Sequence, residues 1–214
     1  MAQPNPTIIF IFLSIFLCLA SIEPSSAQPQ NKTQTLAYIE SSCEGTRYRD
    51  LCISCLARFV NFSIGGPQNL AHVALSVSLS RALQTRGYLS KVVKELEELK
   101  TDRVYLTVQD CVKQIDDSVD KLSQAIKELR RLNKGTTIDD NFLWHISNVE
   151  TWVSTALTDA SYCVQSLPGH RMSKRIATIK VKAQNVAEVT SNALALFHRY
   201  ASRYRAATRA NKKP

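Results

Sequence analysis

Cysteines are the residues of this chain whose type and spacing most clearly predict chemistry. Cys111 lies about 25 residues before the turn at Thr136, and Cys163 lies about 27 residues after it. At about 1.5 Å per helical residue, these arms measure about 37 and 40 Å. If they are antiparallel helices, the two cysteines lie nearly level, where a disulfide needs Cα atoms about 4.4–6.8 Å apart. We therefore predict a Cys111–Cys163 disulfide at the open end of a helical hairpin; two unpaired, buried cysteines are the alternative.

Cys18 lies in the apolar amino-terminal segment, and the three other cysteines, Cys43, Cys52 and Cys55, predict a second disulfide. Cys43 and Cys52 lie at the facing ends of two short helices, which the sequence predicts over 35–42 and 51–60. Cys55 follows Cys52 by one helical turn, so spacing alone allows either Cys43–Cys52 or Cys43–Cys55. The C-x-x-C pattern of Cys52 and Cys55 follows no predicted strand and has no second pair of Cys or His ligands. These absences argue against a redox or zinc site.

Carboxylate and histidine side chains are also candidates for catalysis, but their spacing does not support it. Asp116, Asp117 and Asp120 share one face of a predicted helix, without an apolar pocket that would separate their pKa values into an acid and a base. The four histidines are not at ligand spacing, and no Gly-x-Ser-x-Gly or glycine-rich phosphate loop occurs. We therefore expect a protein that is not an enzyme and has no metal or cofactor. The aspartates would form either a contact surface or an ordinary solvated face.

The amino-terminal segment predicts export from the cell. Residues 7–21 are almost wholly apolar but shorter than the about 20 residues of a membrane-spanning helix, and small residues follow at 25–27. We expect residues 1–27 to be a signal peptide, which leaves a secreted, extracellular protein with no stable membrane insertion. An uncleaved anchor is the alternative, because no Lys or Arg precedes the apolar run. Asn31 and Asn61 begin sequons and are the expected glycosylation sites.

Apolar residues recur at intervals of three and four through four long segments, which is the pattern of amphipathic helices. The segments cover 68–99, the stretch from 103 to a turn at 133–137, the stretch through 142–157, and the stretch after Pro168-Gly169. Short connections between them predict an all-α, up-down-up-down four-helix bundle over 67–205. An N-terminal helical hairpin over 33–62 would precede it, and residues 28–214 would form a single domain.

The charge of the chain is strongly positive. It has 27 Lys and Arg against 18 Asp and Glu, a formal net charge of +9, and a basic tail is predicted over 206–214. In a cytoplasmic protein this charge would favour nucleic acid, but in a secreted protein it matches acidic polysaccharide or another anionic surface. We therefore expect no nucleic-acid partner. A charge that only keeps the protein soluble is the alternative.

Four groups of residues, taken together, resemble the plant invertase and pectin methylesterase inhibitor family over the whole chain after residue 27. They are Cys43 with Arg49-Asp50-Leu51-Cys52, Asp110-Cys111 with Asp117-Ser118-Val119-Asp120, Val149-Glu150-Thr151-Trp152 up to Cys163, and Thr190-Ser191-Asn192-Ala193-Leu194. The resemblance implies Cys43–Cys52 and Cys111–Cys163 disulfides, a free Cys55, and a four-helix bundle with an N-terminal helical hairpin. It also implies a non-enzymatic inhibitor without a cofactor.

The family has two classes of target enzyme. Inhibitors of invertase resemble one another in a Pro-Lys-Phe tripeptide near the end of the bundle, where this chain has Pro168-Gly169-His170. The stretch 190–196 is also more similar to the pectin methylesterase side. The resemblance therefore implies a secreted inhibitor of pectin methylesterase in the plant cell wall. An inhibitor of cell-wall or vacuolar invertase is the first alternative, and a non-inhibitory basic wall- or membrane-binding protein is the second.

On this resemblance, one face of the bundle would block the pectin-binding cleft of the enzyme in a 1:1 complex. The expected contact residues are Asp117 and Asp120 on one helix, with Glu150 and Tyr162 on the next. Tyr162 departs from the family pattern, because many such inhibitors have Thr directly before the last cysteine. A bulky phenol there would change the affinity or the choice of enzyme. The basic tail at 206–214 would bind acidic pectin.

Overall fold

The computed structural model describes residues 29–62, 64–97, 103–132, 140–169 and 172–211. The chain divides into two compact units, Met1–Gln34 and Thr35–Pro214. In the first unit, the described residues 29–34 are helical. The predicted signal peptide and the predicted turn at 133–137 lie outside the described residues. Among the helices that are described, none combines the length and apolar character that crossing a membrane requires.

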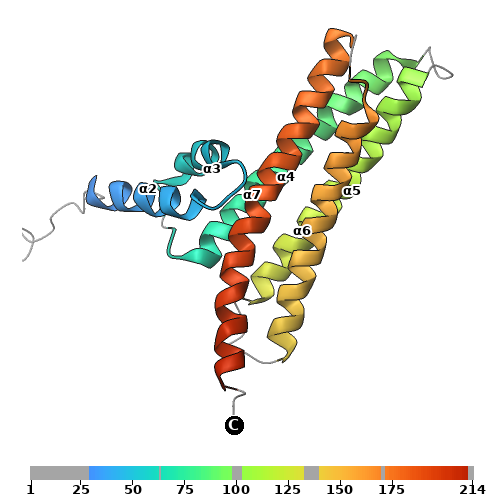
Figure 1. Ribbon diagram of the computed structural model, residues 1–214. Coiled ribbons are helices and arrows are strands. Elements are labelled where there is room, and N and C mark those ends of the chain that lie inside the picture. Colours follow the sequence, from blue (N-terminus) through green and yellow to red (C-terminus); the bar gives the residue numbers. More distant parts are fainter. Residues whose placement is uncertain (1–28, 63, 98–102, 133–139, 170–171, 212–214) are drawn as a thin grey trace, which may run out of the picture. The chain divides into compact units, whose positions relative to one another are not determined.

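Four long helices of the second unit form a bundle (Figure 1). They are α4 (Pro67–Glu95), α5 (Arg103–Leu132), α6 (Asp140–Ser166) and α7 (Lys174–Asn211). Contacts join α4 to α5, α5 to α6, α6 to α7, and α7 back to α4, so helices that are consecutive in the chain are neighbours in space. The described residues contain no β-strand. The predicted all-α, up-down-up-down bundle is confirmed.

The core of the bundle consists of the apolar stripes that the sequence predicts. On α5, the stripe that steps by three and four residues from Val108 to Leu129 is buried, and on α7 the same holds from Ile176 to Phe197. Burying one such aliphatic or aromatic side chain stabilises the fold by about 1.5–3 kcal/mol. Packing of these stripes, rather than intrinsic helix propensity, therefore holds the helices together.

An N-terminal helical hairpin precedes the bundle. It consists of α2 (Pro29–Cys43), α3 (Arg49–Leu56) and the short 3-10 helix η1 (Ala57–Phe59). The Cys43–Cys52 disulfide closes it, with 5.8 Å between the two Cα atoms, and α3 contacts both α7 and α4. Cys55 is buried and its thiol is free. The structure thus contains the first of the two pairings left open by spacing.

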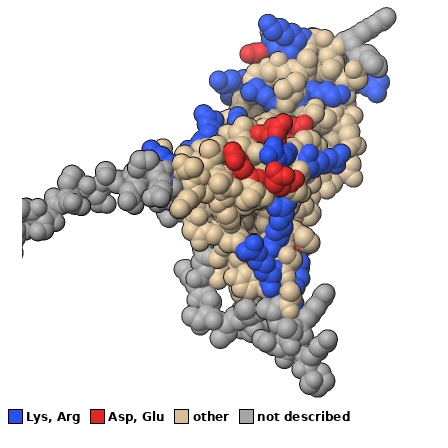
Figure 2. Space-filling model, turned by 60° about the vertical axis from the view of Figure 1, so that its left-hand side comes forward, with Lys and Arg blue, Asp and Glu red and all other residues tan. Residues whose placement is uncertain are grey.

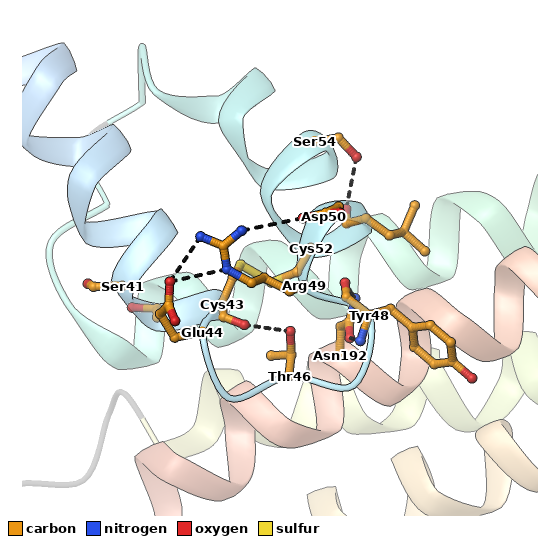
Figure 3. The surroundings of a disulfide bond; sticks show 12 residues. Ser41, Cys43, Glu44, Thr46, Tyr48, Arg49, Asp50, Cys52, Ser54 and Asn192 are labelled. Carbon is orange, nitrogen blue, oxygen red and sulfur yellow. Dashed lines mark hydrogen bonds and ion pairs between the residues drawn. A yellow bond between two sulfur atoms is a disulfide. The ribbon is translucent and has the colours of Figure 1, made fainter.

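The loop between α2 and α3 is fastened to α7 (Figure 3). The Oδ1 atom of Asn192 accepts a hydrogen bond from the Tyr48 backbone N–H (3.1 Å), and its Nδ2 donates to the Tyr48 carbonyl (2.8 Å). The Arg199 guanidinium donates to the carbonyl of Ser42. A Cβ atom at Gly45 would collide with that guanidinium, so a larger residue here would displace the end of the flexible Arg199 side chain.

No helix boundary occurs at residue 206, where the sequence predicts that the bundle gives way to a tail. α7 continues to Asn211, so the backbone of the predicted tail is helical up to that residue. Alanine and arginine are strong helix formers, and neither glycine nor proline occurs between residues 200 and 211. Local propensity therefore extends the helix past the point where the apolar stripe ends.

Candidate contact surface on α5 and α6

A disulfide fixes the relative orientation of α5 and α6. Cys111 and Cys163 are both buried, and their Cα atoms are 4.6 Å apart. These two helices also share the most extensive contact in the bundle. Residues one turn from either cysteine share its side of the helix, because positions three and four apart are neighbours on a helical surface. The Cys111–Cys163 disulfide thus determines which residues face the α5–α6 seam.

Two carboxyl groups interact across this seam. Asp159 lies one turn before Cys163 on α6, and its Oδ2 atom is buried without a hydrogen-bond partner among the described residues. Burial raises the pKa of Asp159, the charge of Asp117 on α5 raises it further, and Lys121 lowers it in part. Asp159 therefore takes up a proton at a higher pH than an ordinary aspartate does.

The other predicted contact residues of α5 and α6, apart from Glu150, are accessible. Asp120 on α5 is exposed, Asp117 is half-buried, and Tyr162 on α6 is 56% exposed. Tyr162 is three residues after Asp159 and is therefore its neighbour on the surface of α6. We use the name α5–α6 face for Asp117, Asp120, Asp159 and Tyr162.

Asp116 is turned towards a different helix. One of its carboxylate oxygens lies 3.5 Å from Nη1 of Arg86 on α4, and both side chains are partly exposed. An exposed ion pair of this kind contributes at most about 1 kcal/mol. Adjacent residues on a helix differ in direction by about 100°, which explains why Asp116 and Asp117 face different neighbours.

Glu150 does not belong to the α5–α6 face. It precedes Asp159 by nine residues, or about two and a half helical turns, so the two side chains lie on opposite sides of α6. Glu150 faces α7, where its Oε1 accepts hydrogen bonds from Nη1 of Arg205 and Nδ1 of His198, both at 2.9 Å. The second guanidinium nitrogen of Arg205 pairs with Oε2. The structure therefore separates Glu150 from the aspartates with which the sequence analysis grouped it.

A buried carboxylate that the sequence analysis missed lies on the same pair of helices. The Glu128 side chain on α5 is 2% exposed and contacts Arg131 (2.9 Å), His145 (2.6 Å) and Asn148 (3.1 Å). Burial has the largest single effect on its pKa and would raise it. The hydrogen bonds from His145 and Asn148, together with the charges of His145 and Arg131, outweigh burial and lower the pKa. Glu128 therefore joins α5 to α6 through its hydrogen bonds to His145 and Asn148, and it has a structural role.

The chemistry of the α5–α6 face is that of recognition. Within the described part of the chain, no group of three or more His, Cys, Asp and Glu side chains is placed to hold a metal ion. The face presents carboxyl groups and a phenol, which can donate or accept hydrogen bonds. One of these carboxyl groups, that of Asp159, loses its proton at a higher pH than an ordinary aspartate does. Asp159 could have been found from the sequence, since it lies four residues before Cys163, which is expected to face α5.

Comparison with known proteins gives consistent matches. The model of the plant invertase/pectin methylesterase inhibitor family matches residues 37–196. The chain is 38% identical to pectinesterase inhibitor 9 of Arabidopsis thaliana over 195 residues. The aligned region covers 90% of this chain and 94% of that protein. It is 34% identical over 206 residues to the 21 kDa protein of Daucus carota. This alignment covers 96% of this chain and 100% of that protein.

A solved structure is also similar to this chain. It is the crystal structure of mutant form A of a pectin methylesterase inhibitor from Arabidopsis, with a TM-score of 0.57 and 19% sequence identity. The match covers 75% of this chain and 95% of that one. At this level of identity, the likeness shows a shared fold alone, and that fold is the helical bundle described above.

Proposed function

Because the chain belongs to the plant invertase/pectin methylesterase inhibitor family, we propose that it inhibits pectin methylesterase. The family consists of non-catalytic inhibitors, so the chain is not an enzyme, as predicted. Several of its relatives are named pectinesterase inhibitors, which supports this target over invertase. The lack of a Pro-Lys-Phe tripeptide at residues 168–170 supports the same choice.

The proposed contact surface is the α5–α6 face, which would block the pectin-binding cleft of the enzyme in a 1:1 complex. The observation that carries this proposal is the exposed phenol of Tyr162 beside the half-buried Asp159–Asp117 pair, on two helices held in fixed register by a disulfide. Rigid presentation lowers the entropic cost of binding. A stable complex buries about 1,600 Å² in total, so neighbouring exposed residues of both helices would also take part.

Titration against purified enzymes tests this function. The chain is added to several pectin methylesterases and to an acid invertase, and residual activity is measured with the substrate of each. We expect inhibition of pectin methylesterase that higher pectin concentrations relieve, and a complex of one inhibitor with one enzyme by light scattering. Inhibition of the invertase alone would establish the alternative target. Inhibition of neither enzyme would favour a wall- or membrane-binding protein.

A mutation pair tests the contact surface. Tyr162→Ala removes the exposed phenol of the α5–α6 face and should weaken inhibition at least tenfold, since buried aromatic anchors dominate many interfaces. Phe62→Ala removes a comparably exposed aromatic side chain (65%) that lies on neither α5 nor α6, and should change inhibition less than twofold. Equal effects of the two substitutions would place the contact surface elsewhere.

Secretion and modification are part of the same proposal. Residues 1–27 would be removed as a signal peptide, residues 28–214 would form a single inhibitor domain in the cell wall, and Asn31 and Asn61 would carry glycans. The exposure of Asn61 in the structure supports its use, since a glycan needs an accessible side chain. Sequencing of the secreted chain from its amino terminus, and its change in mass on enzymatic deglycosylation, test these points.

A further inference from the structure

A cavity of about 230 Å³ lies between the N-terminal hairpin and α4, away from the α5–α6 face. Arg58 and Phe59 line it from the hairpin side. Ser76, Ser80, Arg81 and Gln84 line it from α4, at the three- and four-residue spacing of one helical face. No lining residue is acidic. The cavity therefore combines two guanidinium groups with hydroxyl, amide and aromatic side chains.

Both arginines of the cavity lack an acidic partner in the described structure. Five other arginines do have one, although not all of the described arginines do: Arg49 pairs with Glu44, Arg86 with Asp116, Arg131 with Glu128, Arg175 with Glu95, and Arg205 with Glu150. Among the described residues, no carboxylate lies within 4.0 Å of a side-chain nitrogen of Arg58 or Arg81. Guanidinium groups match carboxylates in planar geometry, so this pair is available for an external carboxylate.

The neutral lining residues have hydrogen-bonding capacity left for a ligand. The Ser76 hydroxyl donates to the carbonyl of His72 (2.8 Å), which leaves its oxygen free to accept. The Ser80 oxygen accepts from Nε2 of Gln84 (3.4 Å), which leaves the Ser80 proton free to donate. Phe59 adds a half-buried apolar ring. Such a mixture of one apolar wall and a few polar groups is typical of a site for a small polar ligand.

We propose that this cavity binds a carboxylate-bearing sugar unit of an acidic polysaccharide, namely the free uronate of de-esterified pectin. Recognition of a carboxylated sugar rests on the cavity itself. The choice of pectin rests on the proposed function, because hydrolysis of a pectin methyl ester produces this carboxylate. On the face shown in Figure 2, Lys and Arg side chains lie at many points from the upper end to the lower part, most of the acidic side chains gather near the middle, and another lies near the upper end. The spread positive charge would attract the rest of a polyanionic chain.

This site differs from the predicted basic tail, and the two are tested by matched charge removal. Arg58→Gln/Arg81→Gln removes two charges from the cavity, and Arg209→Gln/Lys212→Gln removes two from the tail. Binding of trigalacturonate to the purified full chain is measured by calorimetry. We expect the cavity variant to bind at least tenfold more weakly and the tail variant to stay within twofold of the unmodified chain. Equal losses, or a loss in the tail variant alone, would overturn the inference.

The methyl ester of trigalacturonate and sodium sulfate test the ligand class. The ester has the same sugars without charge and should bind at least tenfold more weakly than the acid. Sulfate should not displace trigalacturonate at equal concentration. An ester that binds as well as the acid, or displacement by sulfate, would mean that the cavity is not a uronate site.

Cys55 gives a second measurement, because this buried residue with a free thiol also lines the cavity. Bound trigalacturonate should slow modification of Cys55 by a thiol reagent in the native protein, whereas its methyl ester should not. No protection at a saturating concentration would overturn the inference. Inhibition of pectin methylesterase, measured in parallel, should be the same for the cavity variant and the unmodified chain. If the unmodified chain inhibits pectin methylesterase but does not bind trigalacturonate, the cavity site is rejected and the proposed function still stands.

Discussion

Asn192 on α7 forms two hydrogen bonds with the backbone of Tyr48, one to its N–H and one to its carbonyl oxygen. Asn192 is only 4% exposed, so these bonds are shielded from water. The side-chain amide is suited to this position because it supplies one donor and one acceptor on adjacent atoms. The pair ties the loop of the N-terminal hairpin to the last helix of the bundle.

We predict that Asn192→Ala loosens this hairpin without disrupting the bundle. Loss of two hydrogen bonds at about 1 kcal/mol each should reduce the free energy of unfolding by about 2 kcal/mol. Amide hydrogen exchange should become faster in α3 and stay unchanged in α5 and α6. Asn185→Ala is the control, since Asn185 is on the same helix and is half-buried. Equal destabilisation by both substitutions would contradict a specific role for Asn192.

The second prediction concerns the count of reactive thiols. Four of the cysteines after residue 27 form the two disulfides, and Cys55 is left as a free, buried thiol. Under denaturing, non-reducing conditions, the secreted chain should therefore react with one equivalent of a thiol reagent, at Cys55. Peptide mapping locates the label. A peptide in which Cys55 is bridged to Cys43 would contradict the pairing in the structure.

The third prediction is that Cys111→Ser strongly destabilises the fold. The Cys111–Cys163 disulfide joins residues 52 apart in sequence, and on a chain-entropy model closure of such a loop contributes about 4 kcal/mol. Thermal unfolding followed by circular dichroism should show a large fall in Tm. The matched control is Cys55→Ala, which removes a thiol but no disulfide. A Tm for Cys111→Ser equal to that of the control would show that the disulfide contributes little.

Much of this fold could be predicted from the sequence, because helix periodicity is a local signal. The stripe on α5 from Val108 to Leu129 is buried as predicted, and its spacing is visible within one segment. The prediction that Cys111 and Cys163 lie at the same height along the bundle required one further assumption, namely that the two helices are antiparallel. The end of α7 was not predicted, because the apolar stripe stops before the helix does.

The candidate site was less predictable, since it depends on how each helix is rotated. Glu150 and Asp159 are on the same helix but face opposite neighbours, and only the position of Cys163 reveals which side faces α5. Asn192 stands in a stretch that resembles the family, yet its partner, Tyr48, lies 144 residues away. Partners that distant leave no periodic signal in a single sequence.

The fourth prediction concerns Glu128 and stability at low pH. Its pKa is below the ordinary value because the hydrogen bonds and charges of its partners outweigh burial. A carboxyl group with a lowered pKa stabilises the fold above its unfolded-state pKa of about 4.5, and this stabilisation is lost as pH falls through the folded-state pKa. Glu128→Gln should therefore cost about 2 kcal/mol at neutral pH and less as the pH falls below about 4.5. Denaturant unfolding across this range checks it, and a constant difference would contradict it.

The last prediction is that inhibition of pectin methylesterase weakens as the pH rises from about 5 to about 7.5. The pKa of Asp159 is raised by burial and by Asp117. Docking of an enzyme would remove more water from this pair and raise the pKa again. The complex would then bind protons that the free inhibitor has released, so it is tighter at low pH by linkage.

Asp159→Asn and Asp117→Asn test that mechanism, because each removes one carboxyl group of the pair and should flatten the pH profile. The control is Glu40→Gln, which removes a negative charge from an exposed position on α2 and should keep the full profile. A carboxyl group with a raised pKa stabilises the fold at a pH below its unfolded-state pKa, and this stabilisation is lost as the pH rises through its folded-state pKa. At neutral pH, Asp159→Asn should therefore not destabilise the protein. A change in the pH profile of inhibition would then not result from unfolding. Inhibition constants that are equal at pH 5 and pH 7.5, or that keep their pH dependence in both Asn variants, would exclude this pair as the proton-binding group.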